Sequence, residues 1–366
     1  MYASILFTDF TKGELAPKFH GRFDKQFYYQ SADELTDFIV LPQGGVTRTP
    51  GTYYKATITS GTGNNDVVRL YHFSPQSGYD YLLVFKHLAV DIYRNDTLKA
   101  TVVTPYAGAD LAELQFQPVD TSLVIVHGSY EPKELDWTDD TTWALNAPWS
   151  PYFSTTHPYP KAVTFHEGRL VFGGTSDQPN SIYGSQIGDV TNFTLGTNPG
   201  DPWEYNVASG GIKWLVSAGY LVIGSGHSEY IMAGKGGGAI TPNIGAVTVK
   251  KQSDFGSEQK MGLLIDGSIL FVQQGGRILR NLVYNSAQAF YQSADLTLLS
   301  DHLFYGGIKE MAYQRSPYSI LWVVTDDGKL LSFSYSPVYG LAAWTEQDFS
   351  TVTSATVESV AVIPGS

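Results

Sequence analysis

Two groups of acidic residues are the first candidates for catalytic chemistry in this chain. One group contains Asp136, Asp139 and Asp140, and the other is the pair Asp326 and Asp327. A glycosidase needs two carboxylates at a set separation across the bond that it cleaves. Both groups lie in polar stretches typical of turns, where Asp is common because its side chain bonds to nearby backbone. We therefore favour a structural use of these residues and predict no catalytic residue.

The other motifs that carry chemistry are absent from the sequence. There is no His-Glu-x-x-His zinc motif and no Gly-x-Ser-x-Gly nucleophile elbow. Gly234-Lys-Gly-Gly-Gly lacks the Lys-Ser/Thr ending of a phosphate-binding loop and is better interpreted as a surface loop. The eight histidines never occur at the spacing of metal ligands. We therefore expect no metal, no cofactor and no enzymatic activity.

An apolar phrase of strand-like residues recurs along the chain at a spacing of about 50 residues. The phrase reads Leu-Val-Ile-Val or a close variant and begins at Leu82, Leu123, Leu170, Leu221, Leu270 and Leu321. Such a period with strand content is typical of a β-propeller, in which each copy is a middle strand of one blade. A large β-sandwich with accidental periodicity is the alternative, and it explains six spaced copies poorly.

The residues around the phrase supply the rest of a blade. A strand and a tight turn precede each copy, as in Ala162-Val-Thr-Phe-His-Glu-Gly. Asp327-Gly328 and Gly275-Gly276 suit hairpin turns, and Leu341-Ala-Ala-Trp-Thr reads as a fourth strand. The predicted fold class is therefore all-β, a β-propeller of six to seven blades with a small N-terminal non-repeat module.

Residues 1–60 do not carry the repeat and form the predicted N-terminal module, and residues 61–366 form the predicted propeller. Within the module, Ser31-Ala-Asp-Glu34 predicts the start of a short helix, and Tyr53-Tyr-Lys-Ala-Thr predicts a strand. The stretch 357–364 resembles the first strand of a further blade. Either this strand closes the ring by joining an existing blade, or the last blade is only begun and the chain is a shortened version, and we favour the second.

The composition limits the class of protein. The chain has 366 residues, no cysteine and a net charge of −12, and aromatic residues make up 14% of it, with 24 Tyr. Disulfides, thiolate metal sites and a Cys nucleophile are excluded. An acidic chain binds nucleic acid poorly because phosphate contacts need Lys and Arg. No apolar run is long enough for a spanning helix, and the first residues do not resemble a secretory signal.

Several stretches together resemble a known family. The most specific are Gly13-Glu-Leu-Ala-Pro-Lys with Gly21-Arg-Phe-Asp24, and Phe38-Ile-Val-Leu-Pro-Gln-Gly-Gly-Val-Thr-Arg-Thr-Pro-Gly-Thr52. Weaker matches include Tyr159-Pro-Lys-Ala-Val-Thr-Phe-His-Glu-Gly-Arg and Val357-Glu-Ser-Val-Ala-Val-Ile-Pro-Gly365. The chain resembles the tail nozzle, or tail tubular protein B-like, proteins of short-tailed bacteriophages. It departs from them at Lys18 and Thr49, where arginines are frequent, and in lacking their C-terminal part.

The resemblance implies a structural tail protein of the virion, made in the host cytoplasm. Such proteins form a homo-oligomeric, usually hexameric, ring below the portal and adaptor, and tail fibres or a tailspike can be further partners. The channel lets the genome pass during ejection, so DNA would be a transient partner without sequence-specific binding. A channel wall lined by acidic residues would keep DNA from sticking.

The resemblance also places the assembly contacts in its two most specific blocks. The predicted interface residues are Gly13, Glu14, Leu15, Pro17, Arg22, Asp24, Gly44, Gly45, Arg48, Pro50 and Gly51. Two other functions stay open. One is a receptor-binding or carbohydrate-binding propeller at a tail tip, for which Trp137, Trp143, Trp149 and Trp203 could stack on sugars. The other, less favoured, is a propeller glycosidase.

Overall fold

The computed structural model describes residues 8–58, 67–149, 152–154, 158–207, 209–287, 290–349 and 356–364. Its regular elements in these ranges are β-strands and short 3-10 helices. The strands form consecutive antiparallel four-stranded sheets in which neighbours along the chain are neighbours in the sheet. This meander is the blade of a β-propeller, so the predicted fold class, an all-β propeller, is confirmed.

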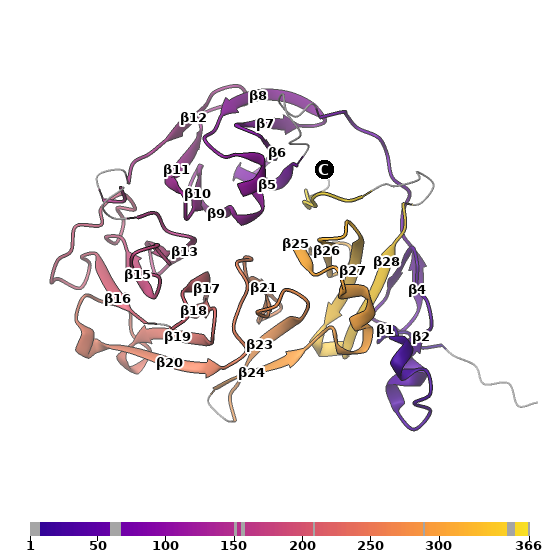
Figure 1. Ribbon diagram of the computed structural model, residues 1–366. Coiled ribbons are helices and arrows are strands. Elements are labelled where there is room, and N and C mark those ends of the chain that lie inside the picture. The colour runs from indigo at the N-terminus through magenta and orange to yellow at the C-terminus, as the bar shows by residue number, and fades with distance from the viewer. Residues whose placement is uncertain are drawn as a thin grey trace, which may run out of the picture. The chain divides into compact units, whose positions relative to one another are not determined.

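Five of the sheets are simple meanders, shown in Figure 1. The first two consist of β5 (Arg69–Gln76), β6 (Tyr79–Lys86), β7 (Ala89–Arg94) and β8 (Thr97–Val103), then β9 (Gln115–Val119), β10 (Ser122–His127), β11 (Tyr130–Trp137) and β12 (Trp143–Asn146). The third consists of β13 (Ala162–His166), β14 (Arg169–Gly173), β15 (Ser181–Gly184) and β16 (Trp203–Asn206). The fourth and fifth consist of β17 (Ile212–Ala218), β18 (Tyr220–Ser225), β19 (Glu229–Gly234) and β20 (Val247–Ser253), then β21 (Leu263–Ile265), β22 (Ser268–Val272), β23 (Leu279–Asn285) and β24 (Phe290–Asp295).

The last sheet is larger because the N-terminal segment joins it. Its meander is β25 (Ile308–Gln314), β26 (Ile320–Thr325), β27 (Leu330–Ser336) and β28 (Leu341–Gln347). Two N-terminal strands lie beyond β28, β1 (Gly13–Glu14) and then β2 (Ser31–Ala32), and both pairings are parallel (Figure 1). A separate hairpin is made by β3 (Phe38–Val40) and β4 (Val46–Arg48).

The short 3-10 helices connect strands. They are η1 (Pro17–Phe19), η2 (Gln26–Gln30), η3 (Gly108–Glu113), η4 (Lys235–Gly237), η5 (Ile244–Ala246), η6 (Leu298–Phe304) and η7 (Pro337–Tyr339). None of the helices in the described part of the chain is long and apolar enough to cross a membrane.

Each copy of the recurring phrase forms the second strand of its sheet, namely β6, β10, β14, β18, β22 and β26. The sequences of these strands are nearly continuous apolar runs because both faces of each strand are buried. In β14 and β22 every residue is buried. The predicted turns also form. Gly275 and Gly276 have φ of 101° and 77°, and Gly328 has φ of 83°, values that glycine tolerates best.

Consecutive sheets pack face to face through aromatic and aliphatic clusters. One cluster joins the first and second sheets around Tyr81, Phe85 and Phe116, and the next joins the second and third sheets around Trp149 and Phe172. Equivalent clusters join the third to the fourth sheet and the fourth to the fifth. Since every inner sheet contributes to two clusters, no blade buries its faces without its neighbours.

The chain divides into two compact units by its internal contacts. One unit comprises Met1–Thr57, Gly275–Arg280 and Ala294–Val362, and the other comprises Ile58–Gln274, Asn281–Ser293 and Ile363–Ser366. The predicted module 1–60 therefore does not stand apart, because its described residues pack with the last sheet. The predicted boundary at residue 60 lies close to the end of this segment at Thr57.

Two further expectations differ from the structure. Residues 357–364 form no strand; the Val357 amide donates to the Gly328 carbonyl, and the Glu310 carboxylate accepts a hydrogen bond from the Ser359 hydroxyl. This stretch lies along the last sheet and does not begin a seventh blade. The helix expected after Ser31 does not form, and β2 takes its place. Ala32 and Leu35 of this segment instead pack against Leu341 and Ala343 of β28.

Candidate binding groove

The carboxylates of the first acidic group lie at or near the surface and accept hydrogen bonds from neighbouring residues. Asp139 closes its own turn by accepting hydrogen bonds from the Thr141 and Thr142 amides at 2.8 and 2.9 Å. These backbone donors hold the pKa of Asp139 below its ordinary value. Asp136 accepts from the Ser122 hydroxyl at 2.6 Å and the Asn146 amide at 2.5 Å. Neither carboxylate stands ready as an acid or base.

Asp140 ties the first sheet to the second. It accepts from the Tyr81 hydroxyl at 2.5 Å and from the Arg94 guanidinium at 2.7 Å, both from the first sheet. The Trp137 indole in turn donates to the Tyr81 hydroxyl at 2.9 Å. The Tyr81 and Arg94 bonds lower the pKa of Asp140, and burial with the Asp140 bond raises that of Tyr81 to about 12. The network is a structural tether.

The second acidic group is also structural. Asp327 accepts from the Thr325 hydroxyl at 2.5 Å in the turn between β26 and β27, and the Asp326 amide donates to the Gly307 carbonyl. The described residues contain no group of three or more His, Asp or Glu side chains that could hold a metal ion.

The first block of predicted interface residues is largely inside the last sheet. Gly13, Glu14 and Leu15 are buried, and Glu14 accepts from the Leu35 amide at 2.9 Å and contacts the His302 ring at 2.8 Å. Gly13 has φ of 72°, and a Cβ there would lie 2.4 Å from the Trp344 nitrogen. Within the protomer these three residues hold β1 against β28, and their use in contact with a neighbouring subunit stays a prediction.

The rest of that block lies on the surface. Pro17 begins η1 and is exposed. Arg22 and Asp24 form an exposed two-point ion pair at 2.7 and 2.8 Å, which lowers the pKa of Asp24 to about 2. The charged groups of Arg22 and Asp24 thus pair with each other within the protomer. The use of Pro17, Arg22 and Asp24 in assembly stays a prediction.

The second block is divided between the inside and the surface. Gly44 is buried with φ of 91°, close to Asp9, and turns the chain between β3 and β4 with Gly45. Arg48, Pro50 and Gly51 are exposed and line a groove of about 900 Å³. This groove contains predicted interface residues, and all its lining residues belong to the unit that holds the last sheet.

The groove lies between the β3–β4 hairpin and one side of the last sheet. Its lining residues are Asp37, Ile39, Thr47, Arg48, Thr49, Pro50, Gly51, Thr52, Gln314, Pro317, Tyr318, Trp322, Leu330, Gln347, Asp348 and Phe349. In the hairpin, Ile39 pairs with Thr47, so both point to one face, whereas Val40 and Val46 pack against Leu341 and Ala343 on the other. The alternation of the hairpin thus gives it a core face and a groove face.

The sheet side of the groove is held rigidly. The Trp322 indole donates to the Gln314 side chain at 2.9 Å, which fixes its ring in a half-buried position. The Gln347 amide donates to the Ser332 and Thr345 hydroxyls at 3.2 Å. Asp37 accepts from the Asp348 amide at 2.9 Å. An aromatic wall beside carboxylates, amides and hydroxyls suits a ligand with both flat apolar faces and hydrogen-bonding groups.

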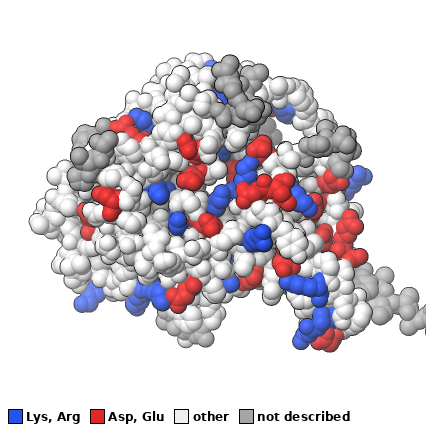
Figure 2. Space-filling view, in the orientation of Figure 1, with Lys and Arg blue, Asp and Glu red and all other residues white. Residues whose placement is uncertain are grey.

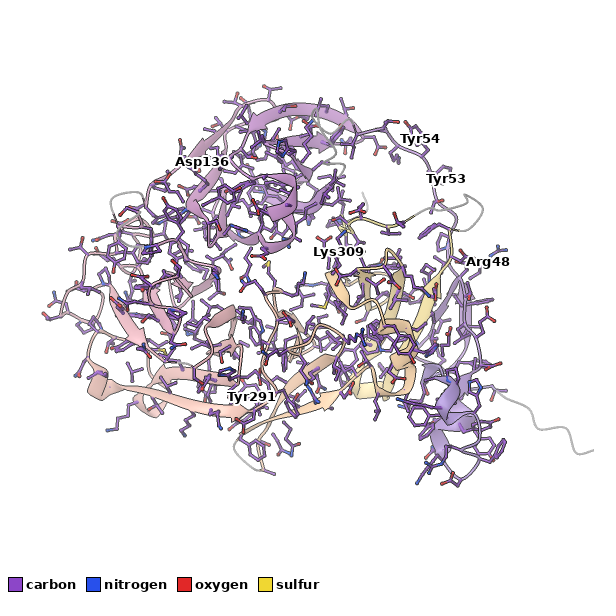
Figure 3. All side chains as sticks on the ribbon, in the orientation of Figure 1. Arg48, Tyr53, Tyr54, Asp136, Tyr291 and Lys309 are labelled. Carbon is purple, nitrogen blue, oxygen red and sulfur yellow. The ribbon has the colours of Figure 1, made fainter. Side chains whose placement is uncertain are left out.

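A strap leaves the groove at its rim. We use this name for residues Thr49–Ile58, of which Gly51–Ile58 have no regular structure, in contrast to the strand predicted from Tyr53. Tyr53 is 88% exposed and Tyr54 is 80% exposed. Figure 3 labels both on the strap beyond Arg48. Neighbouring tyrosines this open are candidates for contact with another molecule.

Sequence reasoning missed the sheet side of the groove. Trp322 lies in β26, whose sequence Ile-Leu-Trp-Val-Val-Thr is an unbroken apolar run and gives no sign that one ring is half-exposed. Tyr318 lies in a turn and is 38% exposed. Only the position of the β3–β4 hairpin beside the last sheet gives either residue a groove to line, and no local sequence pattern encodes that position.

Comparisons with known proteins assign no family. No family model matches the chain, and no curated protein matches it. Among solved structures, a chain of the mitotic checkpoint complex is 10% identical with a TM-score of 0.47, and the match covers 86% of this chain and 93% of that one. A catalytically inactive virginiamycin B lyase from Staphylococcus aureus, solved with quinupristin, is 12% identical with a TM-score of 0.48, over 81% of this chain and 89% of that one.

Proposed function

We propose that this chain is a structural component of an assembly, namely the tail nozzle of a short-tailed bacteriophage, and that it has no enzymatic activity. The observation that carries the proposal is the position of the two blocks that resemble this family. Both lie outside the blade repeat, and the second block supplies one wall of the groove and the start of the strap. The hairpin and the strap form a groove with the last sheet and expose Tyr53 and Tyr54 beside it. Such a surface suits contact with other proteins.

The state of the carboxylates supports a non-enzymatic role. Asp136, Asp139 and Asp140 are each used in turns or tethers, as the distances above give. A propeller glycosidase would need a pair of carboxylates that face a substrate. The groove carries Asp37 and Asp348, but the Asp37 carboxylate accepts the Asp348 amide and so serves the fold.

The proposed partners follow from the same role. The chain forms a homo-oligomeric ring in the virion tail, below the portal and adaptor proteins, and DNA passes through without being bound. Tail fibres or a tailspike attach outside the ring. A tail-tip propeller that binds carbohydrate is the second candidate, because the groove pairs Trp322 and Tyr318 with polar side chains.

The first test is the particle mass in solution with negative-stain images of the same sample. A ring of about six copies around a central hole would support the nozzle proposal. The adaptor can act as a template for the ring, so the same measurement is repeated with the adaptor protein present. Monomers under both conditions, together with retention on a glycan array, would reject the nozzle in favour of the carbohydrate-binding propeller.

A further inference from the structure

We propose that the groove of one copy receives Tyr53 and Tyr54 from the strap of a second copy. This inference rests on the proposed function and deepens it, because it names the residues on both sides of a contact within the ring. A head-to-tail contact of this kind joins the tyrosines of each copy to the groove of the next copy, as a closed ring requires.

The exposure of the two tyrosines is the first observation. With 88% and 80% of their surfaces open, both rings face water in the isolated chain. Within the protomer, the Tyr54 hydroxyl contacts the Thr57 hydroxyl at 2.6 Å, a bond inside the strap that anchors it to no sheet. Large aromatic rings that meet a partner provide much contact area at little cost in conformational freedom.

The groove offers what tyrosine side chains need. Trp322 and Tyr318 give an aromatic wall, and aromatic pairs gain from stacked or edge-to-face contact. A tyrosine hydroxyl must find a hydrogen-bond partner when it is buried, and the carboxylates of Asp37 and Asp348 are acceptors on the same lining. The volume of about 900 Å³ falls in the usual range for binding pockets.

The charges of the two surfaces are complementary. The lining carries two carboxylates, Asp37 and Asp348, against the single guanidinium of Arg48. The strap Thr49–Ile58 has Lys55 as its sole charged residue, directly after the tyrosines. A positive strap that enters a groove with one excess negative charge is favoured over a negative one, which sets the direction of the contact.

The small surface area that the two tyrosines can bury explains why the proposed contact depends on a closed ring. Two tyrosines bury about 300–500 Å² together. A stable pair of proteins buries about 800 Å² on each partner, so this contact alone is too small to hold two copies together. In a closed ring every copy makes the contact twice, and the linked contacts strengthen one another.

The test uses the absence of cysteine from the chain. Single-cysteine variants Tyr54→Cys and Tyr318→Cys are purified separately, mixed in equal amounts under the conditions of the mass measurement, and treated with a short bismaleimide. We expect at least about tenfold more cross-linked dimer in this mixture than when Lys250→Cys, an exposed position on β20, replaces the groove variant. Dimer no more abundant than this control would overturn the proposal.

A double variant separates contact between copies from contact within one copy. If Tyr54→Cys/Tyr318→Cys cross-links within a monomer at high dilution while the mixture of single variants gives no dimer, the strap closes its own groove and the proposal fails. Rings in the images without cross-linked dimer would reject this contact and leave the nozzle proposal standing. Cross-linked dimer from particles that are not rings would reject the nozzle and leave the contact standing.

Discussion

Gly13 shows how a residue that looks suited to contact with a neighbour serves the protein's own core. It lies in a glycine-containing block and was predicted to grip another subunit. Its φ of 72° and the 2.4 Å that would separate a Cβ from the Trp344 nitrogen show that only glycine fits between β2 and β28. The fold therefore requires glycine at this position.

We therefore expect Gly13→Ala to lower the free energy of unfolding by about 3 kcal/mol, because the new methyl group meets backbone and φ is unfavourable. Chemical denaturation followed by tryptophan fluorescence measures this, since Trp344 lies at the contact. Gly51→Ala is the matched control: a Cβ at Gly51 meets nothing within 4 Å, so its change should stay within about 0.5 kcal/mol. Equal effects at the two positions would contradict the argument.

At the scale of elements, side-chain tethers supplement the apolar clusters between sheets. Asp140 on the β11–β12 turn reaches Tyr81 and Arg94 of the first sheet, and Arg94 also lies over the Tyr79 ring at 4.2 Å. Inside the third sheet, buried Arg169 donates to the carbonyls of Pro199, Gly200 and Asp201 and so holds a long loop. Polar residues thus fix loops that the strand pattern does not specify.

The Asp140 tether predicts a dependence of stability on pH. Its folded pKa is lowered below 3.8, so the ionised carboxylate stabilises the fold above that value, and this contribution is lost as pH falls through the folded pKa. We expect Asp140→Asn to lower the urea midpoint at about pH 6 and to lower it by less at about pH 3, where part of the contribution of the carboxylate is already lost. Asp120→Asn, an equal change of charge at an exposed turn, serves as the control. A midpoint difference that persists unchanged at low pH would contradict the tether.

The sequence predicted the blades well and the N-terminal segment poorly, for a physical reason. Each blade is local: its strands are consecutive, and the apolar run of the second strand marks its burial on both faces, as in β22. The segments around Gly13 and Ser31 take their structure from β28, which lies more than 300 residues away in the chain. No local pattern records that partner, so β2 was mistaken for the start of a helix and the half of the groove around Trp322 was missed.

At the scale of the whole molecule, the net charge of −12 governs how the chain meets DNA. On the face seen in Figure 2, positive and negative side chains are interspersed among uncharged surface, with no broad basic area. Binding to duplex DNA needs clustered Lys and Arg that displace counterions from phosphates. We therefore expect that face to bind duplex DNA weakly.

We expect the protein to leave the mobility of a duplex DNA fragment unchanged at about 0.15 M salt. A gel-shift titration measures this, and a charge-reversed variant in which several exposed acids become Lys provides the positive control. Retardation by the unaltered protein at that salt would contradict a conduit that lets DNA slide through.

The parallel pairing of β1 with β28 also bears on how the chain is made. β1 leaves the ribosome more than 300 residues before β28, and the strands of the other sheets are made between them. Leu15 and Leu35 stay without their packing partners while every other blade is completed. Until Trp344 has been synthesised, these apolar N-terminal residues stay exposed and can be bound by chaperones and proteases. Once β28 has formed, they are buried. The last sheet can therefore take up β1 only after the five sheets between them in the sequence have been synthesised.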